Sequence, residues 1–155
     1  MTSMKDTLQT DLTDAMRARD EVKVATLRLA LSAITKAEVA GKEQVTLSDR
    51  DVVGVLRSEM KKRHEAADMY DTGGRADRAV RERAEAEVLA RYLPPEMDDA
   101  ALGTIVAEEA ATVTATGASG GKAMGQVVKA VRERAGDGAD GARIAAAVKS
   151  ALGLD

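Results

Sequence analysis

Aromatic side chains are nearly absent from this chain of 155 residues. It has no phenylalanine and no tryptophan, and its two tyrosines are Tyr70 and Tyr92. A hydrophobic core must therefore be built from leucine, valine, isoleucine, methionine and alanine, whose slim side chains let helix axes approach closely. Sheet proteins normally carry more aromatic and β-branched residues. The composition favours an all-α fold.

Cysteine is also absent, which excludes disulfides and thiolate metal sites together. No apolar run approaches the roughly 20 residues that a membrane-spanning helix needs. Residues 1–12 hold no apolar segment of the kind found in signal peptides. We therefore expect a soluble, cytoplasmic protein with no membrane partner.

Proline is scarce, and the only two prolines are adjacent, Pro94 and Pro95. Proline lacks a backbone donor and disfavours helical backbone in the residue before it. This pair is therefore the strongest predicted boundary in the chain. Because apolar residues recur at helical spacing on both sides of it, we expect a four-helix N-terminal domain, residues 1–93, and a small three-helix tail bundle, residues 96–155. The tail is close to the lower size at which a domain folds alone.

End signals and apolar stripes define the predicted helices. Asp20, Ser48 and Asp98 are expected to cap the second, third and fifth helices. Gly41 and Gly73–Gly74 are expected to end the second and third. The residues expected to face the core are Leu8, Leu12, Ala15, Met16, Val24, Leu27, Leu31, Ile34, Val52, Val55, Leu56, Met60, Ala67, Val80, Ala84, Val88, Leu89, Leu102, Ile105, Val106, Met124, Val127, Val128, Val131, Ile144, Val148 and Leu152.

A glycine-rich stretch, GASGGKAMGQVVKAV, opens at Gly117 and contains Lys122. A Walker-type phosphate loop needs a glycine at its first position and serine or threonine after the lysine, directly following a strand. Thr116 and Ala123 stand at those two positions, and an acidic helical segment precedes them, so the Walker interpretation is rejected. Two interpretations stay open. The stretch is either a flexible connector that starts a helix, or a helix N-terminus whose bare amides attract anions such as nucleic-acid phosphates.

His64 is the only histidine and the chain has no cysteine, so no ordinary zinc site can be built around it. A Ser-His-acid triad would need this histidine and a buried serine, and nothing in the pattern indicates either. We expect His64 on a solvent face, together with the neighbouring basic run at 61–63, paired with nearby acids at helical spacing. On the fourth helix we expect a ladder of ion pairs rather than an acid–base couple. Its members are Arg78, Arg81, Glu82 and Glu85. The residues alone predict no catalytic residue, no metal site and no cofactor.

The net charge of −3 conceals a local asymmetry. Residues 1–93 hold 17 basic and 17 acidic groups, residues 94–119 hold five acids and no base, and residues 120–155 hold six bases and four acids. The end of the chain therefore permits a local basic patch beside an acidic helix.

The chain resembles the YqeY-like (GatB/YqeY) family over nearly its whole length. The stretches that carry the resemblance are residues 27–38, 48–70, 73–97 and 121–131. Two features make it specific: the YLP ending of the fourth helix, Tyr92–Pro94, and the later G-x-x-M-G-x-V pattern, Gly121–Val127.

That family is similar to the C-terminal part of the B subunit of tRNA-dependent amidotransferases, which convert glutamyl- or aspartyl-tRNA into glutaminyl- or asparaginyl-tRNA. The resemblance implies a helical N-terminal domain and a smaller helical tail that holds tRNA. The resemblance also implies carbon–nitrogen ligase activity with glutamine as amido-N-donor, but only as an association of the family. The parts of those enzymes that carry out the reaction are absent here, and a family relationship by itself supplies no site.

The resemblance directs the functional prediction to the basic side chains of the tail, as contacts for tRNA or another structured RNA. The candidates are Lys122, Lys129, Arg132, Arg134, Arg143 and Lys149. The first three lie at i, i+7 and i+10 of the sixth predicted helix, hence on one face. Since the tail has no aromatic residue, stacking on single-stranded bases is not expected there. The alternative function is a protein-interaction module in which the third and fourth helices dock on amidotransferase subunits or on a synthetase. The sequence leaves the oligomeric state open.

Overall fold

The computed structural model describes residues 2–154, and within that range the regular structure is helical with no strand. The all-α prediction is confirmed. The elements are α1 (Met4–Ala18), α2 (Glu21–Glu38), α3 (Asp49–Thr72), α4 (Ala76–Ala90), α5 (Asp99–Thr114), α6 (Gly120–Ala135), the short 3-10 helix η1 (Gly136–Gly138) and α7 (Gly141–Ala151).

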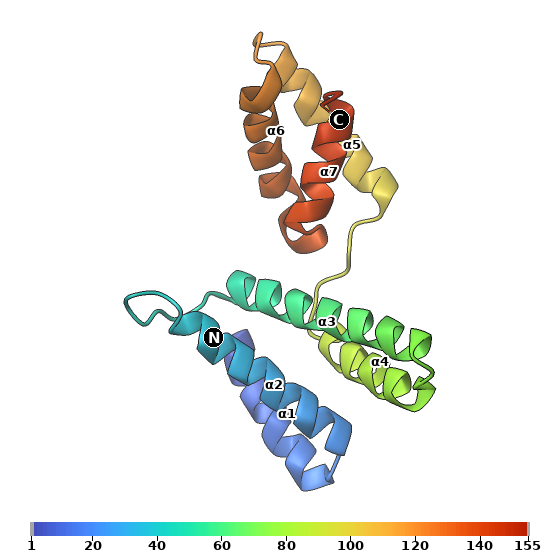
Figure 1. The fold of residues 1–155 in the computed structure, drawn as a ribbon. Helices are drawn as coiled ribbons and strands as arrows, with labels where there is room; N and C mark the ends of the chain where they lie inside the picture. Colours follow the sequence, from blue (N-terminus) through green and yellow to red (C-terminus); the bar gives the residue numbers. More distant parts are fainter. Residues whose placement is uncertain (1, 155) are drawn as a thin grey trace. The chain divides into compact units, whose positions relative to one another are not determined.

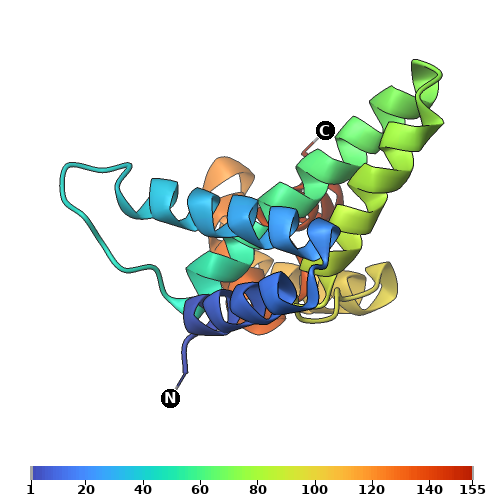
Figure 2. The ribbon, with the colours of Figure 1, turned by 90° about the horizontal axis from the view of Figure 1, so that it is seen from below.

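The chain divides into two compact units by its internal contacts, Met1–Leu93 and Pro94–Asp155. We call them the N-terminal unit and the C-terminal unit. In the N-terminal unit, α1 and α2 form one antiparallel hairpin, and α3 and α4 form another (Figure 1). Figure 2, seen from below, shows the same pairing. That each unit is a domain able to fold on its own stays a prediction.

Polar side chains start the helices of the N-terminal unit. Ser3 and Ser48 each accept a hydrogen bond from the third residue of the helix, and the carboxylates of Asp6 and Asp51 accept from the serine amides, which completes two capping boxes. The caps predicted at Ser48 and Asp20 are confirmed. The Ser3 cap was not predicted, although Ser3 and Asp6 have the required spacing.

The second helix ends at Glu38 with Val39 as its C-cap, one residue earlier than a C′ glycine at Gly41 implies. The reason lies in the loop that follows. The carbonyl oxygen of Glu38 accepts from the amide of Val45, and its carboxylate accepts from the amide of Leu47. Because Glu38 binds the returning chain with both groups, the backbone leaves the helix at this residue.

The buried core of the N-terminal unit is aliphatic. It comprises Leu8, Leu27, Ala30, Ile34, Val52, Leu56, Val88 and Leu89. Two predicted core residues are wrong: Val80 is 67% exposed and Met16 is 43% exposed. On α4 it is Ala79, fully buried, that faces inward. The predicted stripe is confirmed at Val88 and Leu89, whereas nearer the start of α4 the buried face runs through Ala79 and Glu85, and Glu85 faces an arginine of α3.

Acidification is expected to destabilise the N-terminal unit in part through Glu38. Lys5 Nζ donates to its carboxylate at 2.5 Å, and this bond, followed by the Leu47 amide, holds the pKa of Glu38 below its ordinary 4.5. Because the folded pKa lies below the unfolded one, ionised Glu38 stabilises the fold fully above the unfolded pKa. That stabilisation is lost as pH falls through the folded pKa.

Glu38→Gln should therefore flatten the acid side of the stability–pH curve, measured by urea unfolding from about pH 6 to pH 3. Glu43→Gln, at an exposed glutamate of the same loop, is the control and should leave the curve as in the wild type. An unchanged acid side in Glu38→Gln would contradict this role.

In the C-terminal unit, α5, α6 and α7 enclose a second aliphatic core. Its buried residues are Leu102, Val106, Ala110, Val113, Ala123, Val127, Val131, Ala135, Ala139, Ile144 and Val148. The predicted cap at Asp98 is confirmed, and Asp140 caps α7 in the same way. Ser119 precedes α6 without a side-chain cap.

Candidate nucleic-acid interface

The glycine-rich stretch is the entry to α6. Gly120 starts the helix with a φ of +60°, a backbone conformation that glycine adopts at little cost. The first turn contains no acidic residue, and Ser119 makes no side-chain cap bond, so the first amides of α6 are not capped by a side chain. Lys122 follows directly and is exposed. The start of α6 therefore combines open amides with a cation, which favours an anion.

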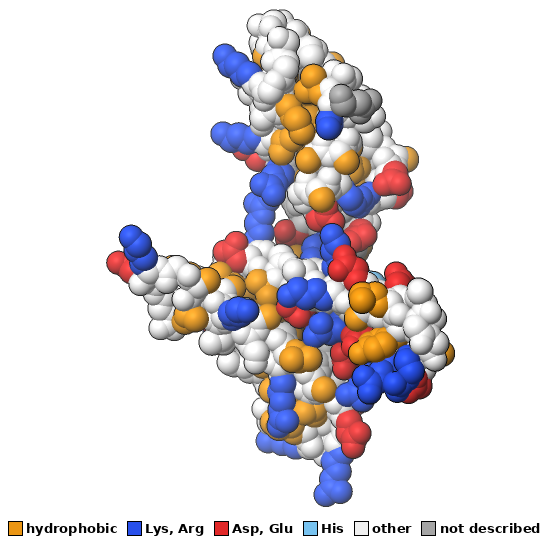
Figure 3. Space-filling model, viewed as in Figure 1, with side chains coloured by type: hydrophobic (Ala, Val, Ile, Leu, Met, Phe, Trp, Pro, Cys, Tyr) orange, Lys and Arg blue, Asp and Glu red, His pale blue; other side chains and the backbone are white. Residues whose placement is uncertain are grey.

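Lys129 extends this positive charge along the helix. It is exposed and lies seven residues, or two turns, after Lys122, about 10 Å further along the axis. Neither lysine forms an ion pair with any residue in the range 2–154. In Figure 3, basic side chains project along the edge that α6 forms. Two unpaired ammonium groups on one face suit a run of phosphates.

Arg132 is exposed but leans toward α7. A Cβ atom on Gly141 would lie 2.7 Å from Arg132 Nη2, so the guanidinium rests against the first residue of that helix. Glu133, also exposed, lies one turn after Lys129 and places a negative charge near the same face. The face predicted from three cations is thus formed mainly by the two lysines.

Arg134 forms ion pairs inside the C-terminal unit. Its Nη1 atom lies 2.8 Å from Glu108 Oε2 and 3.1 Å from Glu109 Oε1, on the acidic helix α5. The hydrogen bond with Glu108, and then that with Glu109, raises the pKa of Arg134. This arginine therefore joins α6 to α5.

Arg143 has a similar role at the other end of α5. Its Nη2 atom donates to the Met97 carbonyl and to Asp99 Oδ1, both at 2.9 Å.

Lys149, in the last turn of α7, is exposed and forms no ion pair among the described residues. The six predicted cations therefore separate into two that hold helices together and four that remain open to solvent.

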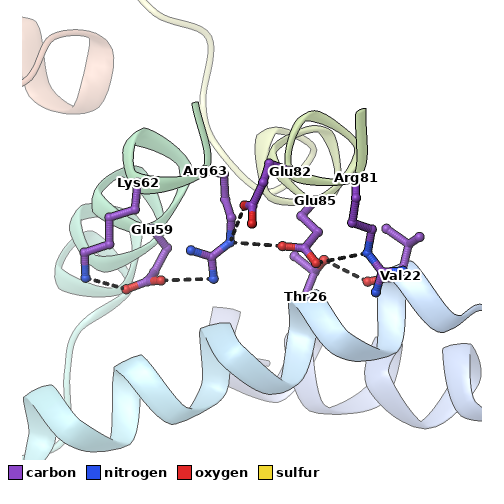
Figure 4. Close-up of polar contacts among 8 residues, drawn as sticks. All are labelled: Val22, Thr26, Glu59, Lys62, Arg63, Arg81, Glu82 and Glu85. Carbon is purple, nitrogen blue, oxygen red and sulfur yellow. Dashed lines mark hydrogen bonds and ion pairs between the residues drawn. The ribbon is translucent and has the colours of Figure 1, made fainter. Parts of the chain in front are cut away.

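The N-terminal unit contains a cluster of charges between α3 and α4 (Figure 4), and the sequence analysis missed the ion pairs that cross between the two helices. Arg63 Nε lies 3.2 Å from Glu85 Oε2, and Arg63 Nη2 lies 3.4 Å from Glu59 Oε2. Glu82 Oε2 is 3.9 Å from Arg63 Nε. The predicted pair between Arg81 and Glu85 is confirmed, at 3.1 Å.

The prediction of a solvent face for residues 61–63 is wrong for Arg63, whose side chain is only 14% exposed because α4 covers it. Lys62 is 63% exposed, as expected. A signal was present in the sequence: Arg63 falls on the apolar stripe of its own helix, seven residues after Leu56 and four before Ala67.

Over residues 2–154, no three histidine, aspartate or glutamate side chains gather as a metal site requires. No helix described there combines the length and the apolar character needed to cross a bilayer.

Comparison with known proteins supports the resemblance seen in the sequence. The family model described as Yqey-like protein matches residues 5–152. The chain is also similar to "Uncharacterized protein C22F3.15" of Schizosaccharomyces pombe (strain 972 / ATCC 24843), with 30% identity over 92 residues. That alignment covers 59% of this chain and 73% of the yeast protein.

Proposed function

The chain belongs to the YqeY-like family, and on that basis we propose that its C-terminal unit binds tRNA or another structured RNA. One observation supports this most: Lys122 and Lys129 lie on one exposed face of α6, both without an ion pair, beyond a helix N-terminus without a side-chain cap. A further exposed cation, Lys149, adds to the positive charge of the same unit.

The recognition we propose is of shape and phosphate rather than of sequence. Lysines bind phosphate as point charges and release counterions from the RNA, which makes the affinity steeply dependent on salt. The C-terminal unit has no aromatic side chain on which an unpaired base could stack. A folded RNA that presents its backbone suits such a surface.

We propose that any carbon–nitrogen ligase reaction associated with this family is carried out by a partner protein. In this proposal the protein holds tRNA for a glutamine-dependent, tRNA-dependent amidotransferase or for a synthetase. It contributes positioning, because the charged clusters described above are internal ion pairs or exposed single cations.

A second candidate function is protein docking without RNA. A groove of about 340 Å³ lies along α2 and α3 and is lined by three alanines, Val55 and Ser58, together with Lys36, Lys62 and Glu59. Its apolar residues, with charges of both signs beside them, would suit an amphipathic partner helix.

Removing the two open lysines of α6 is expected to weaken RNA binding. Lys122→Gln with Lys129→Gln should lower the slope of log affinity against log salt by about 1.5–2, because two phosphate contacts are lost. The affinity for bulk tRNA at low salt should fall by about tenfold or more. Fluorescence anisotropy with labelled tRNA measures both quantities.

The charge-matched control is Lys42→Gln with Lys61→Gln, which removes two exposed lysines of the N-terminal unit. It should leave affinity and slope close to those of the wild type. Equal losses in the two double variants would contradict a specific α6 face. If the wild type binds no tRNA, protein docking is the better proposal, and a pull-down from cell extract with and without RNase identifies the class of partner.

A further inference from the structure

A hollow on the α3–α4 hairpin has no part in the binding face of α6. It has a volume of about 330 Å³ and is lined by Tyr70 of α3 and by Arg78, Arg81, Glu82 and Glu85 of α4. We propose that this hollow binds one unstacked nucleotide of an RNA, with the base against Tyr70 and Arg78 and the phosphate on the arginines. The inference rests on the proposed RNA-binding function and adds a contact in the N-terminal unit.

Tyr70 provides the aromatic surface that the C-terminal unit lacks. The other tyrosine, Tyr92, donates its hydroxyl proton to Asp11 Oδ2 at 2.5 Å and packs against the core. The Tyr70 hydroxyl forms no hydrogen bond among the described residues. The guanidinium carbon of Arg78 lies 5.8 Å from the centre of the Tyr70 ring. Aromatic rings and guanidinium planes are the surfaces on which proteins stack unpaired bases.

The arginines provide donors for a phosphate. Arg78 forms no ion pair within residues 2–154. Arg81 uses its Nε atom on Glu85, and its side chain is 45% exposed. The two residues lie at i and i+3, so they share one face of α4. A guanidinium has five N–H donors, so one bond to Glu85 leaves most of the Arg81 donors for a ligand.

The two glutamates of the hollow do not make it anionic, because arginines neutralise them. Figure 4 shows Glu85 between Arg63 and Arg81, and Glu82 beside Arg63. Counted with Glu59, which Arg63 also contacts, three arginines (Arg63, Arg78, Arg81) face three glutamates, so the cluster carries no net negative charge. Two neighbouring arginines of the hairpin differ: Arg75 pairs with Asp77, and Arg83 pairs with aspartates of α3. The Arg78 guanidinium, which forms no ion pair among the described residues, lies over the Tyr70 ring.

The test uses the full chain, labelled tRNA, and uridine 5′-monophosphate as an independent probe of the hollow. Tyr70→Ala should lower tRNA affinity by about fivefold or more, which is the loss expected for one stacked base. The loss should persist at higher salt, because stacking is not ionic. Arg78→Gln should also weaken binding, whereas Tyr70→Phe, which keeps the ring, should change it little. Arg75→Gln removes the same charge from a paired arginine and should leave the affinity unchanged.

The outcomes separate this inference from the proposed function. If tRNA binds and weakens on loss of Lys122 and Lys129, but Tyr70→Ala and Arg78→Gln bind like the wild type, the inference is overturned and the proposed function stands. If no tRNA binds, the proposed function fails, and NMR titration with uridine 5′-monophosphate decides the inference. Amide shifts confined to α3 and α4, and lost in Arg78→Gln, would support the hollow as a nucleotide site. Their absence would overturn it.

Discussion

Replacement of Ile144 by alanine is expected to destabilise the C-terminal unit strongly while the stability of the N-terminal unit stays the same. Ile144 is 1% exposed in a core made only of aliphatic side chains. Truncating a buried isoleucine costs about 2–5 kcal/mol. A unit of this size has a total stability of only about 3–9 kcal/mol. The expected loss is therefore a large part of the free energy of unfolding of this unit.

The chain offers a simple way to measure this effect. Both tyrosines, Tyr70 and Tyr92, belong to the N-terminal unit, so tyrosine fluorescence reports on that unit alone. Far-UV circular dichroism reports on the helices of both. In Ile144→Ala, helical signal should be lost at lower denaturant than in the wild type, while the fluorescence transition keeps its midpoint.

The matched control for this variant is Ile105→Ala, which makes the same truncation at a partly buried position of α5. It should lower the stability of the C-terminal unit by a smaller amount, because part of the side chain already contacts water. If the fluorescence and dichroism transitions of Ile144→Ala shift together, the two units unfold as one, and the prediction of two independent domains is wrong.

Arg63→Met is expected to destabilise the N-terminal unit by about 3 kcal/mol. Methionine keeps much of the volume but removes the cation that faces Glu59, Glu82 and Glu85. The Glu59 and Glu85 side chains are 13% and 11% exposed, so their charges would remain largely desolvated without their main partner. Urea unfolding followed by tyrosine fluorescence measures the loss.

Lys62→Met serves as the control, because Lys62 also pairs with Glu59 but its side chain is 63% exposed. An exposed pair is worth about 0–1 kcal/mol, so this variant should stay close to the wild type. Adding Glu85→Leu to Arg63→Met should recover part of the lost stability, because it removes one of the buried carboxylates that the first substitution leaves without Arg63. Equal stabilities for Arg63→Met and Lys62→Met would show that the buried cluster contributes nothing beyond a surface pair.

The local features of the fold follow from the sequence. Serine and aspartate caps, helical spacing of apolar residues and glycine at the end of α3 depend on neighbours within a few positions, so they can be read from the chain alone. The start of α6 at Gly120 and the rejection of a Walker loop belong to the same class. The family membership also came from the sequence, because its motifs are local patterns.

Tertiary structure alone decided which charges are free. Arg134 and Arg143 looked the same as Lys122 and Lys129 in the sequence, yet both pair with acids of α5. The partners of Arg134 lie 25 or 26 positions away, and that of Arg143 lies 44 positions away, so only helix packing brings them together.

Packing also set which face of α4 is buried. Val80 fits an apolar stripe in the sequence but is exposed, while Ala79 and the charged Glu85 face inward. Helical periodicity predicts the buried face of a helix from the apolar residues of that helix alone. Which face is buried also depends on the side chains of the helix that packs against it. Arg63 of α3 supplies a partner for Glu85, so the face that carries a charge is the one that α3 covers. The sequence by itself determined where the helices are, and contacts between helices determined which side chains remain available for function.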